Sequence, residues 1–146
     1  MFSLKNGNVQ ARDGQISSII VDAAWRKEDL WSTVAWCIVL PQRTVGLQFS
    51  SIFKAHSPLQ AETVACLKAI LWAKDNGWRT VTFLSDFLVM IQALCYPDQA
   101  DHRIRPLIKD ILNVATNFFS VCNVIKVNKS LVQLAHRLAK LALSHI

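Results

Sequence analysis

Residues 57–65 read Ser-Pro-Leu-Gln-Ala-Glu-Thr-Val-Ala, and they contain the most clearly marked helix start in the chain. Ser57 suits the N-cap, Pro58 suits the first helical position, and Gln60 stands three residues after the cap, as in a capping box. We expect this helix to end at Asn76-Gly77, because glycine readily adopts the left-handed conformation that stops a helix. Glu62 is therefore expected in the first turn or two.

The segments before this helix are rich in β-branched and aromatic residues, which favour strands. They are Ile16 to Ala24, Val34 to Leu40 and Thr44 to Phe53. Pro41-Gln42-Arg43 predicts a tight connection between the second and third segments. The three segments are therefore predicted to form an antiparallel meander.

The segments after the helix alternate between strand and helix patterns. They are a strand at Thr80 to Leu84, helices at Phe87 to Leu94 and Ile104 to Phe118, a strand at Val121 to Val127, and a last helix from Leu131 to Ala142. The order βββαβααβα predicts an α/β fold with a mixed five-stranded sheet and helices on both faces. At 146 residues the chain is expected to form one domain over residues 1–146, with its core at about 16–144.

The composition favours a packed globule, because hydrophobic residues make up 52% of the chain and charged residues 18%. Each apolar run is interrupted before the roughly 20 residues that a membrane span requires, and Met1 to Ser18 lacks the apolar core of a signal peptide. We expect a monomer that lies inside the cell and does not contact a membrane. The sequence does not distinguish the nucleus from the cytoplasm. The net charge of +6 is compatible with a nucleic-acid partner.

Three carboxylates occupy positions that suggest one cation site. Asp22 follows the apolar run Ile19-Ile20-Val21, Glu62 lies near the start of a helix, and Asp86 lies where a strand gives way to a helix. An acid at the end of a buried strand is costly unless something neutralises it. Asp86 alone would also suit a charge at a helix N-terminus, and Glu62 alone would suit an exposed acid.

Four motifs in this order resemble the ribonuclease H-like domains of the plant, reverse-transcriptase-related type. They are Val21-Asp22, the run from Ser57 to Ala65, the run from Phe83 to Val89, and the run from Ala135 to Ala142, so that the resemblance covers about Ile19 to Leu143. The resemblance implies a ribonuclease H-like fold. It also implies a retroelement-derived origin.

The activity that this resemblance implies is the hydrolysis of the RNA strand of an RNA/DNA hybrid by two Mg²⁺ ions, with Mn²⁺ as a substitute. Asp22, Glu62 and Asp86 fall on the family's first three metal-binding acids, with Asp22 bridging the ions. The fourth acid falls at His136, and imidazole binds Mg²⁺ less well than a carboxylate does. We therefore take Asp22, Glu62, Asp86 and His136 as catalytic candidates, with a solvated position on the flank of its helix as the other interpretation of His136.

Two further departures from the family concern substrate recognition. The family's flexible His-bearing loop is missing, because residues 126–130 are short and lack a histidine, and Pro58 and Leu59 stand where asparagines would read a 2′-hydroxyl. A second function class is therefore a retroelement-derived module that binds nucleic acid and cleaves slowly or not at all. The residues expected to contact RNA/DNA hybrid or RNA are Trp25, Arg26, Lys27, Ser57 and Gln60.

Overall fold

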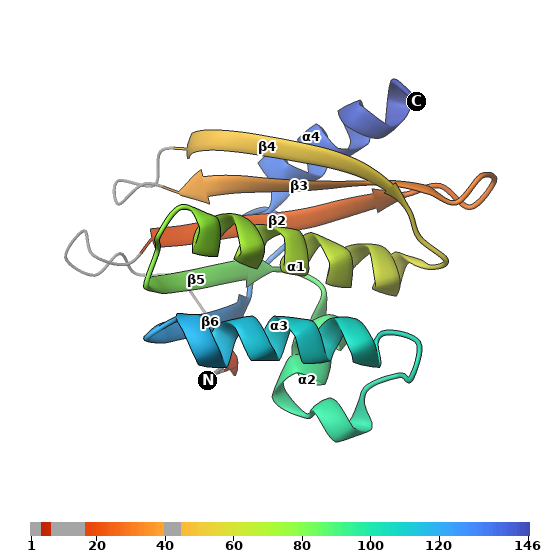
Figure 1. The fold of residues 1–146 in the computed structure, drawn as a ribbon. Coiled ribbons are helices and arrows are strands. Elements are labelled where there is room, and N and C mark those ends of the chain that lie inside the picture. The colour runs from red at the N-terminus through yellow and green to blue at the C-terminus, as the bar shows by residue number, and fades with distance from the viewer. Residues whose placement is uncertain (1–3, 7–16, 40–44) are drawn as a thin grey trace.

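The computed structural model describes residues 4–6, 17–39 and 45–146, and its centre is one six-stranded sheet in the order β1-β6-β5-β2-β3-β4 (Figure 1). The strands are β1 (Leu4–Asn6), β2 (Ser17–Trp25), β3 (Trp31–Val39), β4 (Val45–Lys54), β5 (Thr80–Ser85) and β6 (Val121–Lys126). β2, β3 and β4 pair antiparallel, whereas β5 and β6 continue the sheet in parallel from β2. The predicted meander is confirmed, while the turn at Pro41-Gln42-Arg43 lies outside the described residues.

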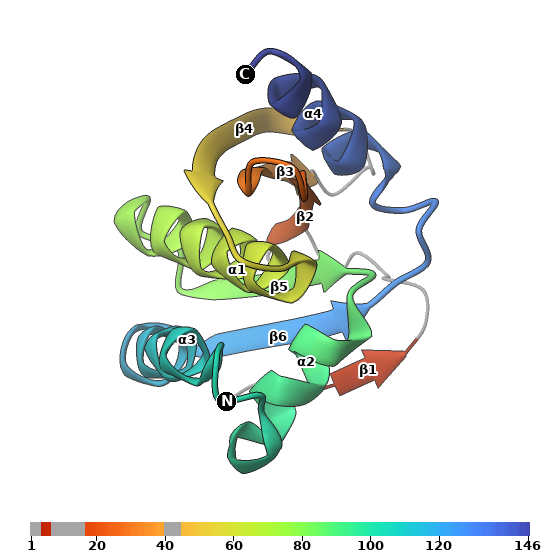
Figure 2. The same cartoon turned by 90° about the vertical axis from the view of Figure 1, so that its right-hand side faces the viewer.

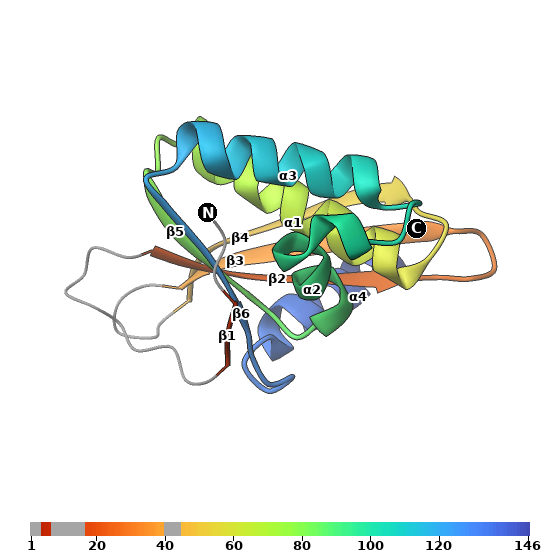
Figure 3. The same ribbon diagram turned by 90° about the horizontal axis from the view of Figure 1, so that it is seen from below.

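Helices cover both faces of the sheet, as the sequence predicts. They are α1 (Pro58–Asp75), α2 (Leu88–Cys95), α3 (Arg105–Phe118) and α4 (Gln133–Ser144), with a short 3₁₀ helix at Pro97–Gln99 between α2 and α3. α1 and α3 lie side by side on one face, and α4 lies on the opposite face (Figure 2). The view from below shows the same three layers (Figure 3). The predicted order βββαβααβα and the ribonuclease H-like class are confirmed.

The strand β1 is the one element of the described sheet that the sequence analysis does not predict. It pairs in parallel with β6, with Leu4 opposite Val124, and it extends the expected five-stranded sheet by one short edge strand. Three residues are too few to show the alternation of apolar and polar positions by which a strand is recognised. Its partner β6 therefore decides its conformation.

Alternation along β2 divides the buried residues between two cores. Ile19 and Val21 belong to the core under α1 and α3, whereas Ile20 and Ala24 belong to the core under α4. Because side chains alternate between faces with a period of two, Asp22 falls on the α4 side. The register of β2 thus decides which helix can contact this acid.

The buried face of α1 differs from the expected one. The sequence pattern favours Val64, Leu67, Ile70 and Leu71 as the inward stripe, but Leu71 is 37% exposed and only Ile70 of these four is buried. Small side chains supply most of the buried face instead, namely Ala61, Thr63, Ala65, Cys66, Ala69 and Ala73. Small contact residues allow closer packing of a helix, and this face carries Glu62 against the sheet.

α4 is attached to the sheet through its alanine face. Ala135 and Ala139 are buried against the second core, and the hydroxyl of Thr33 in β3 donates a hydrogen bond to the carbonyl oxygen of Ala139. The sequence pattern favours an inward stripe made of Leu131, Leu134, Ala135, Leu138, Leu141 and Ala142. Ala135 is buried and Leu134 and Leu138 pack against the second core, whereas Leu141 is 58% exposed, so the stripe is confirmed only in part. No helix in the described part of the chain combines the length and apolar character that a membrane crossing requires.

The first prediction concerns the start of α1. Ser57 is the N-cap, and its hydroxyl oxygen accepts a hydrogen bond of 3.0 Å from the backbone N–H of Gln60. Ser57→Ala should lower the free energy of unfolding by about 1 kcal/mol, whereas Ser57→Gly should lower it by only a few tenths of that amount, because glycine leaves the cap open to water. Urea denaturation of the two variants measures the difference, and equal losses would contradict the capping role.

Candidate active site

Asp22 lies within β2, close to the carboxyl end of the strand, as the sequence predicts. The strand continues to Trp25, but its pairing with β5 ends where Ile20 lies opposite Leu84. Beyond this point β2 has β3 on one side and no longer pairs with β5 on the other. Asp22 is 3% exposed and lies at this opening, at the carboxyl end of two parallel strands, where α/β folds commonly bind ligands.

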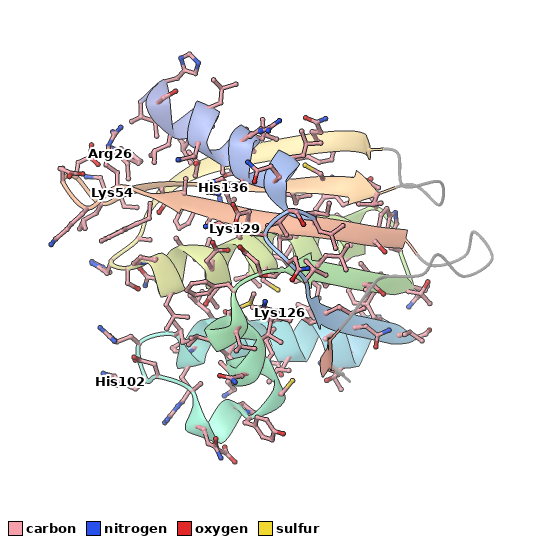
Figure 4. All side chains as sticks on the ribbon, turned by 180° about the vertical axis from the view of Figure 1, so that it is seen from behind. Arg26, Lys54, His102, Lys126, Lys129 and His136 are labelled. Carbon is pink, nitrogen blue, oxygen red and sulfur yellow. The ribbon has the colours of Figure 1, made fainter. Side chains whose placement is uncertain are left out.

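His136 on α4 holds the carboxylate of Asp22. The ring Nδ1 of His136 lies 2.7 Å from Oδ2 of Asp22, and the two side chains are 26% and 5% exposed. His136 is therefore partly exposed to solvent and also paired with Asp22. Figure 4 shows His136 on the face of the sheet that α4 covers. The residue at the position of the family's fourth acid thus contacts the first acid.

Glu62 reaches the same region from the opposite helix layer. It lies in the second turn of α1 and is 7% exposed, so its interpretation as an exposed acid is wrong. Its Oε1 accepts a hydrogen bond of 3.3 Å from the backbone N–H of Ala23, next to Asp22. Its buried Oε2 receives no hydrogen bond from any residue that the structure describes.

Asp86 follows β5 directly and precedes α2, whose N-cap is Phe87. Asp86 is predicted at the helix N-terminus, whereas the helix begins at Leu88. The charge of Asp86 raises the pKa of both Asp22 and Glu62, so the three acids share one region. Across residues 4–6, 17–39 and 45–146 no group of three or more His, Cys, Asp or Glu side chains is arranged to hold a metal ion, and the three-carboxylate metal site stays a prediction.

Burial dominates the electrostatics of the two central acids. For Asp22, burial raises the pKa most, the hydrogen bond to His136 opposes this rise, and the net pKa lies above its ordinary value. For Glu62, burial and then the charge of Asp22 raise the pKa well above its ordinary value. A proton on Glu62 also lets it donate to Asp22, which favours the protonated form further. The pair therefore binds either a proton or another cation more readily than an exposed acid does.

A cavity of about 400 Å³ lies beside these acids, between the end of β2, the start of α1 and the second half of α4. It is lined by Ala23, Ala24, Trp25, Arg26, Pro58, Ala61, Glu62, His136, Lys140, Leu143 and Ser144. Most of these residues are apolar, and Arg26 and Lys140 supply positive charge. Lys140 is not among the site residues predicted from the sequence, although its spacing of four residues from His136 places both on one face of the helix.

The structure separates the expected nucleic-acid contacts into two groups. Trp25 and Arg26 line the cavity, although the indole N–H of Trp25 donates to the carbonyl oxygen of Ala55 at 2.8 Å. Arg26 also forms an ion pair of 2.7 Å with Asp29. Lys27 is exposed in the connection between β2 and β3.

Ser57 and Gln60 have structural partners at the start of α1. Ser57 caps the helix, and Oε1 of Gln60 accepts a hydrogen bond of 2.6 Å from the backbone N–H of His56. These contacts account for both side chains without a ligand. A role of either residue in nucleic-acid binding stays a prediction.

Comparisons with known proteins agree with this arrangement. The sequence model of the family described as reverse transcriptase-like matches residues 20–142. No curated protein sequence matches the chain.

Solved structures share the fold at low sequence identity. Ribonuclease H1 of the halophilic archaeon Halobacterium salinarum NRC-1 is 20% identical, with a TM-score of 0.80 over 90% of this chain and 99% of that protein. The metagenomic LC11 ribonuclease H1, solved in complex with RNA/DNA hybrid, is 12% identical, with a TM-score of 0.72 over 85% of this chain and 94% of that one. The native protease-reverse transcriptase of prototype foamy virus is 14% identical, with a TM-score of 0.67, over 92% of this chain and 21% of that protein.

The second prediction concerns the pH dependence that Glu62 imposes on stability. Its pKa is higher in the folded protein than the ordinary 4.5, so the folded state retains a proton that the unfolded state has lost. The contribution of Glu62 to stability is therefore present below the unfolded pKa and declines as the pH rises toward the folded pKa. The slope approaches about 1.4 kcal/mol per pH unit in that range.

Glu62→Gln should remove this slope, because the amide does not ionise and its oxygen can still accept from Ala23. The variant should gain stability relative to the wild type as the pH rises above 4.5. Urea denaturation at a series of pH values measures this difference. A difference between the two proteins that stays constant with pH would contradict the raised pKa.

Proposed function

Because this chain belongs to the reverse transcriptase-like family and has the ribonuclease H-like fold, we propose that it binds RNA/DNA hybrids and hydrolyses their RNA strand at Asp22 and Glu62, with Mg²⁺ or Mn²⁺ as cofactor. One observation carries the proposal: two buried, adjacent acids meet beside a cavity at the carboxyl ends of β2 and β5. Strongly perturbed acids in a hollow of the surface are typical of functional sites.

The described protein groups compensate the charges of this site only in part. His136 partners Asp22, but Glu62 has one backbone donor and an unpartnered oxygen among the described residues. Burying a carboxylate without compensation costs free energy, and an apolar residue in place of Glu62 would avoid that cost. The arrangement is better explained by a ligand that supplies positive charge.

The donor set fits one divalent cation held by Asp22 and Glu62. Mg²⁺ keeps several waters and is commonly bound through one or two carboxylates together with the phosphates of a substrate. The free Oε2 of Glu62 is an oxygen of the kind this ion prefers. Among the described side chains, no group of three or more ligands for a metal ion is found, so the proposal is limited to one cation. When bound, the cation supplies electrostatic stabilisation to the reacting phosphate and lowers the pKa of a water.

The protein's own residues orient this site. The N–H of Ala23 fixes one oxygen of Glu62, and His136 fixes one oxygen of Asp22, so that both carboxylates are held from rigid elements. Asp86 adds negative charge that strengthens the attraction for a cation. The LC11 ribonuclease H1, solved with a hybrid, supports the choice of substrate class.

A second candidate function is a nucleic-acid-binding module that does not cleave. The contact of 2.7 Å between His136 and Asp22 favours this candidate, because it engages an oxygen that a cation would otherwise use. Imidazole also leaves the site one negative charge short of the family's four acids. Binding and cleavage therefore have to be measured separately.

The third prediction is a direct test of the proposed activity. A labelled RNA/DNA hybrid should be bound in EDTA, and its RNA strand should be cut when Mn²⁺ or, more slowly, Mg²⁺ is added. Asp22→Asn should abolish cleavage and change the dissociation constant of the hybrid by no more than about threefold. A tenfold change would require about 1.4 kcal/mol of binding free energy, and one recessed acid contributes less than that. Binding without cutting under either metal would leave the module as the function, and loss of both binding and cutting in the wild type would refute the proposal.

The fourth prediction is that His136→Asp strengthens the cation site. The substitution replaces the imidazole that contacts Asp22 with a carboxylate, so Mg²⁺ affinity measured by calorimetry should rise about tenfold, or about 1.4 kcal/mol. His145→Asp makes the same change of charge at the exposed end of α4 and should leave Mg²⁺ affinity unchanged. Equal effects of the two variants would show a general charge effect in place of a local one.

Cleavage by His136→Asp separates the two candidate functions further. If the weakness of the site is electrostatic, hybrid cleavage should rise together with Mg²⁺ affinity, and adding Asp22→Asn should abolish both. Tighter metal binding without cleavage would place the defect in substrate recognition and favour the non-cleaving module.

A further inference from the structure

The positive charge of this chain is unevenly distributed along the sequence. The last acidic residue is Asp110, and the segment after it carries Lys126, Lys129, Arg137 and Lys140. This segment includes β6, the connection to α4, and α4 itself. One continuous stretch of chain therefore supplies cations without any acid to balance them.

Lys126 lies on one side of the acidic site. It is the last residue of β6 and lies opposite Ser85 in the parallel pairing with β5, one residue before Asp86. The backbone N–H of Val127 donates to the carbonyl oxygen of Ser85 at 2.9 Å, which holds the start of the connection against the same strand end. Figure 4 shows Lys126 at the end of β6, Lys129 in the connection that follows and His136 on α4.

Lys140 lies on the other side of the site. It follows His136 by one turn of α4, and it lines the same cavity as Glu62 and Arg26. Its side chain is exposed. The segment after Asp110 thus brings one cation to the Asp86 side of the site and another to the Glu62 side.

These lysines have no anionic partner among the described residues. Ion pairs of the described part of the chain connect Arg26 with Asp29 and Arg103 with Asp101, and two histidines also contact acids. The amines of Lys126 and Lys140 take part in none of them. Positive charges without an anionic partner on both sides of an acidic site are suited to bind an external polyanion.

We infer that Lys126 and Lys140 bind backbone phosphates of the nucleic acid on the two sides of the Asp22–His136 pair; this inference rests on the proposed function. The acids in the centre repel a phosphodiester, so a strand can approach them only if cations on each side offset the repulsion. Phosphate contacts of this kind fix the position of a strand without reading its sequence. Lys126 and Lys140 then align the strand with the acids. The short connection after β6 contains no histidine that could do this.

The test compares two double variants that each remove two positive charges. Lys126→Gln with Lys140→Gln alters the proposed contacts, and Lys74→Gln with Lys109→Gln alters exposed lysines on the helices of the opposite face. The dissociation constant of a labelled RNA/DNA hybrid is measured in EDTA at several salt concentrations from 50 to 200 mM. Far-ultraviolet circular dichroism checks that all the variants are folded.

Loss of two phosphate contacts should reduce the slope of log Kd against log salt concentration by about 1.8, because each contact contributes about 0.9 to that slope. The matched control should retain the wild-type slope. Equal slopes in the two double variants, with hybrid binding by the wild type intact, would overturn this inference and leave the proposed function standing. Absence of hybrid binding by the wild type would instead refute the proposed function, and the inference with it.

Discussion

The parallel pairing of β2 with β5 is the constraint on which the rest of the site depends. Parallel strands place their carboxyl ends at the same edge, so Asp22 on β2 and Asp86 after β5 are brought together although they are far apart in the chain. The pairing ends at Ile20, which opens the sheet beside Asp22. α1 packs on one face of the sheet beside this opening and contributes Glu62, and α4 packs on the other face and contributes His136.

The site is a compromise between burial and charge. Glu62 and Asp22 lose the solvation that favours their ionised forms. The charge of Asp86 raises the pKa of both acids, and the charge of Asp22 raises the pKa of Glu62 further, whereas the hydrogen bond from Glu62 lowers the pKa of Asp22. His136 partly compensates Asp22 through its ring nitrogen, and Ala23 partly compensates Glu62 through its backbone N–H. The remaining uncompensated negative charge favours the binding of a proton or a metal cation. It also repels a phosphodiester unless nearby lysines offset the repulsion.

His136 connects the two candidate functions. In a carboxylate-rich site the fourth acid would increase the attraction for cations, whereas the imidazole here occupies an oxygen of the first acid. The same contact ties α4 to the sheet next to the hydrogen bond from Thr33 to Ala139. The residue therefore contributes to the packing of α4 and to the chemistry of the site, which is why a test of its chemical role needs a readout of metal binding in addition to stability.

The sequence by itself determined the order of the elements, the start and end of α1, and the residues of the site as candidates, because helix caps, the left-handed Gly77 and strand alternation are local signals. It did not determine β1, the small-residue face of α1, or the role of His136. Those depend on partners that are distant in the chain: β6 for β1, the sheet for α1, and Asp22 for His136. Contacts between residues that far apart arise only when the chain has folded, since packing across layers, and not local conformational preference, decides which side chains meet.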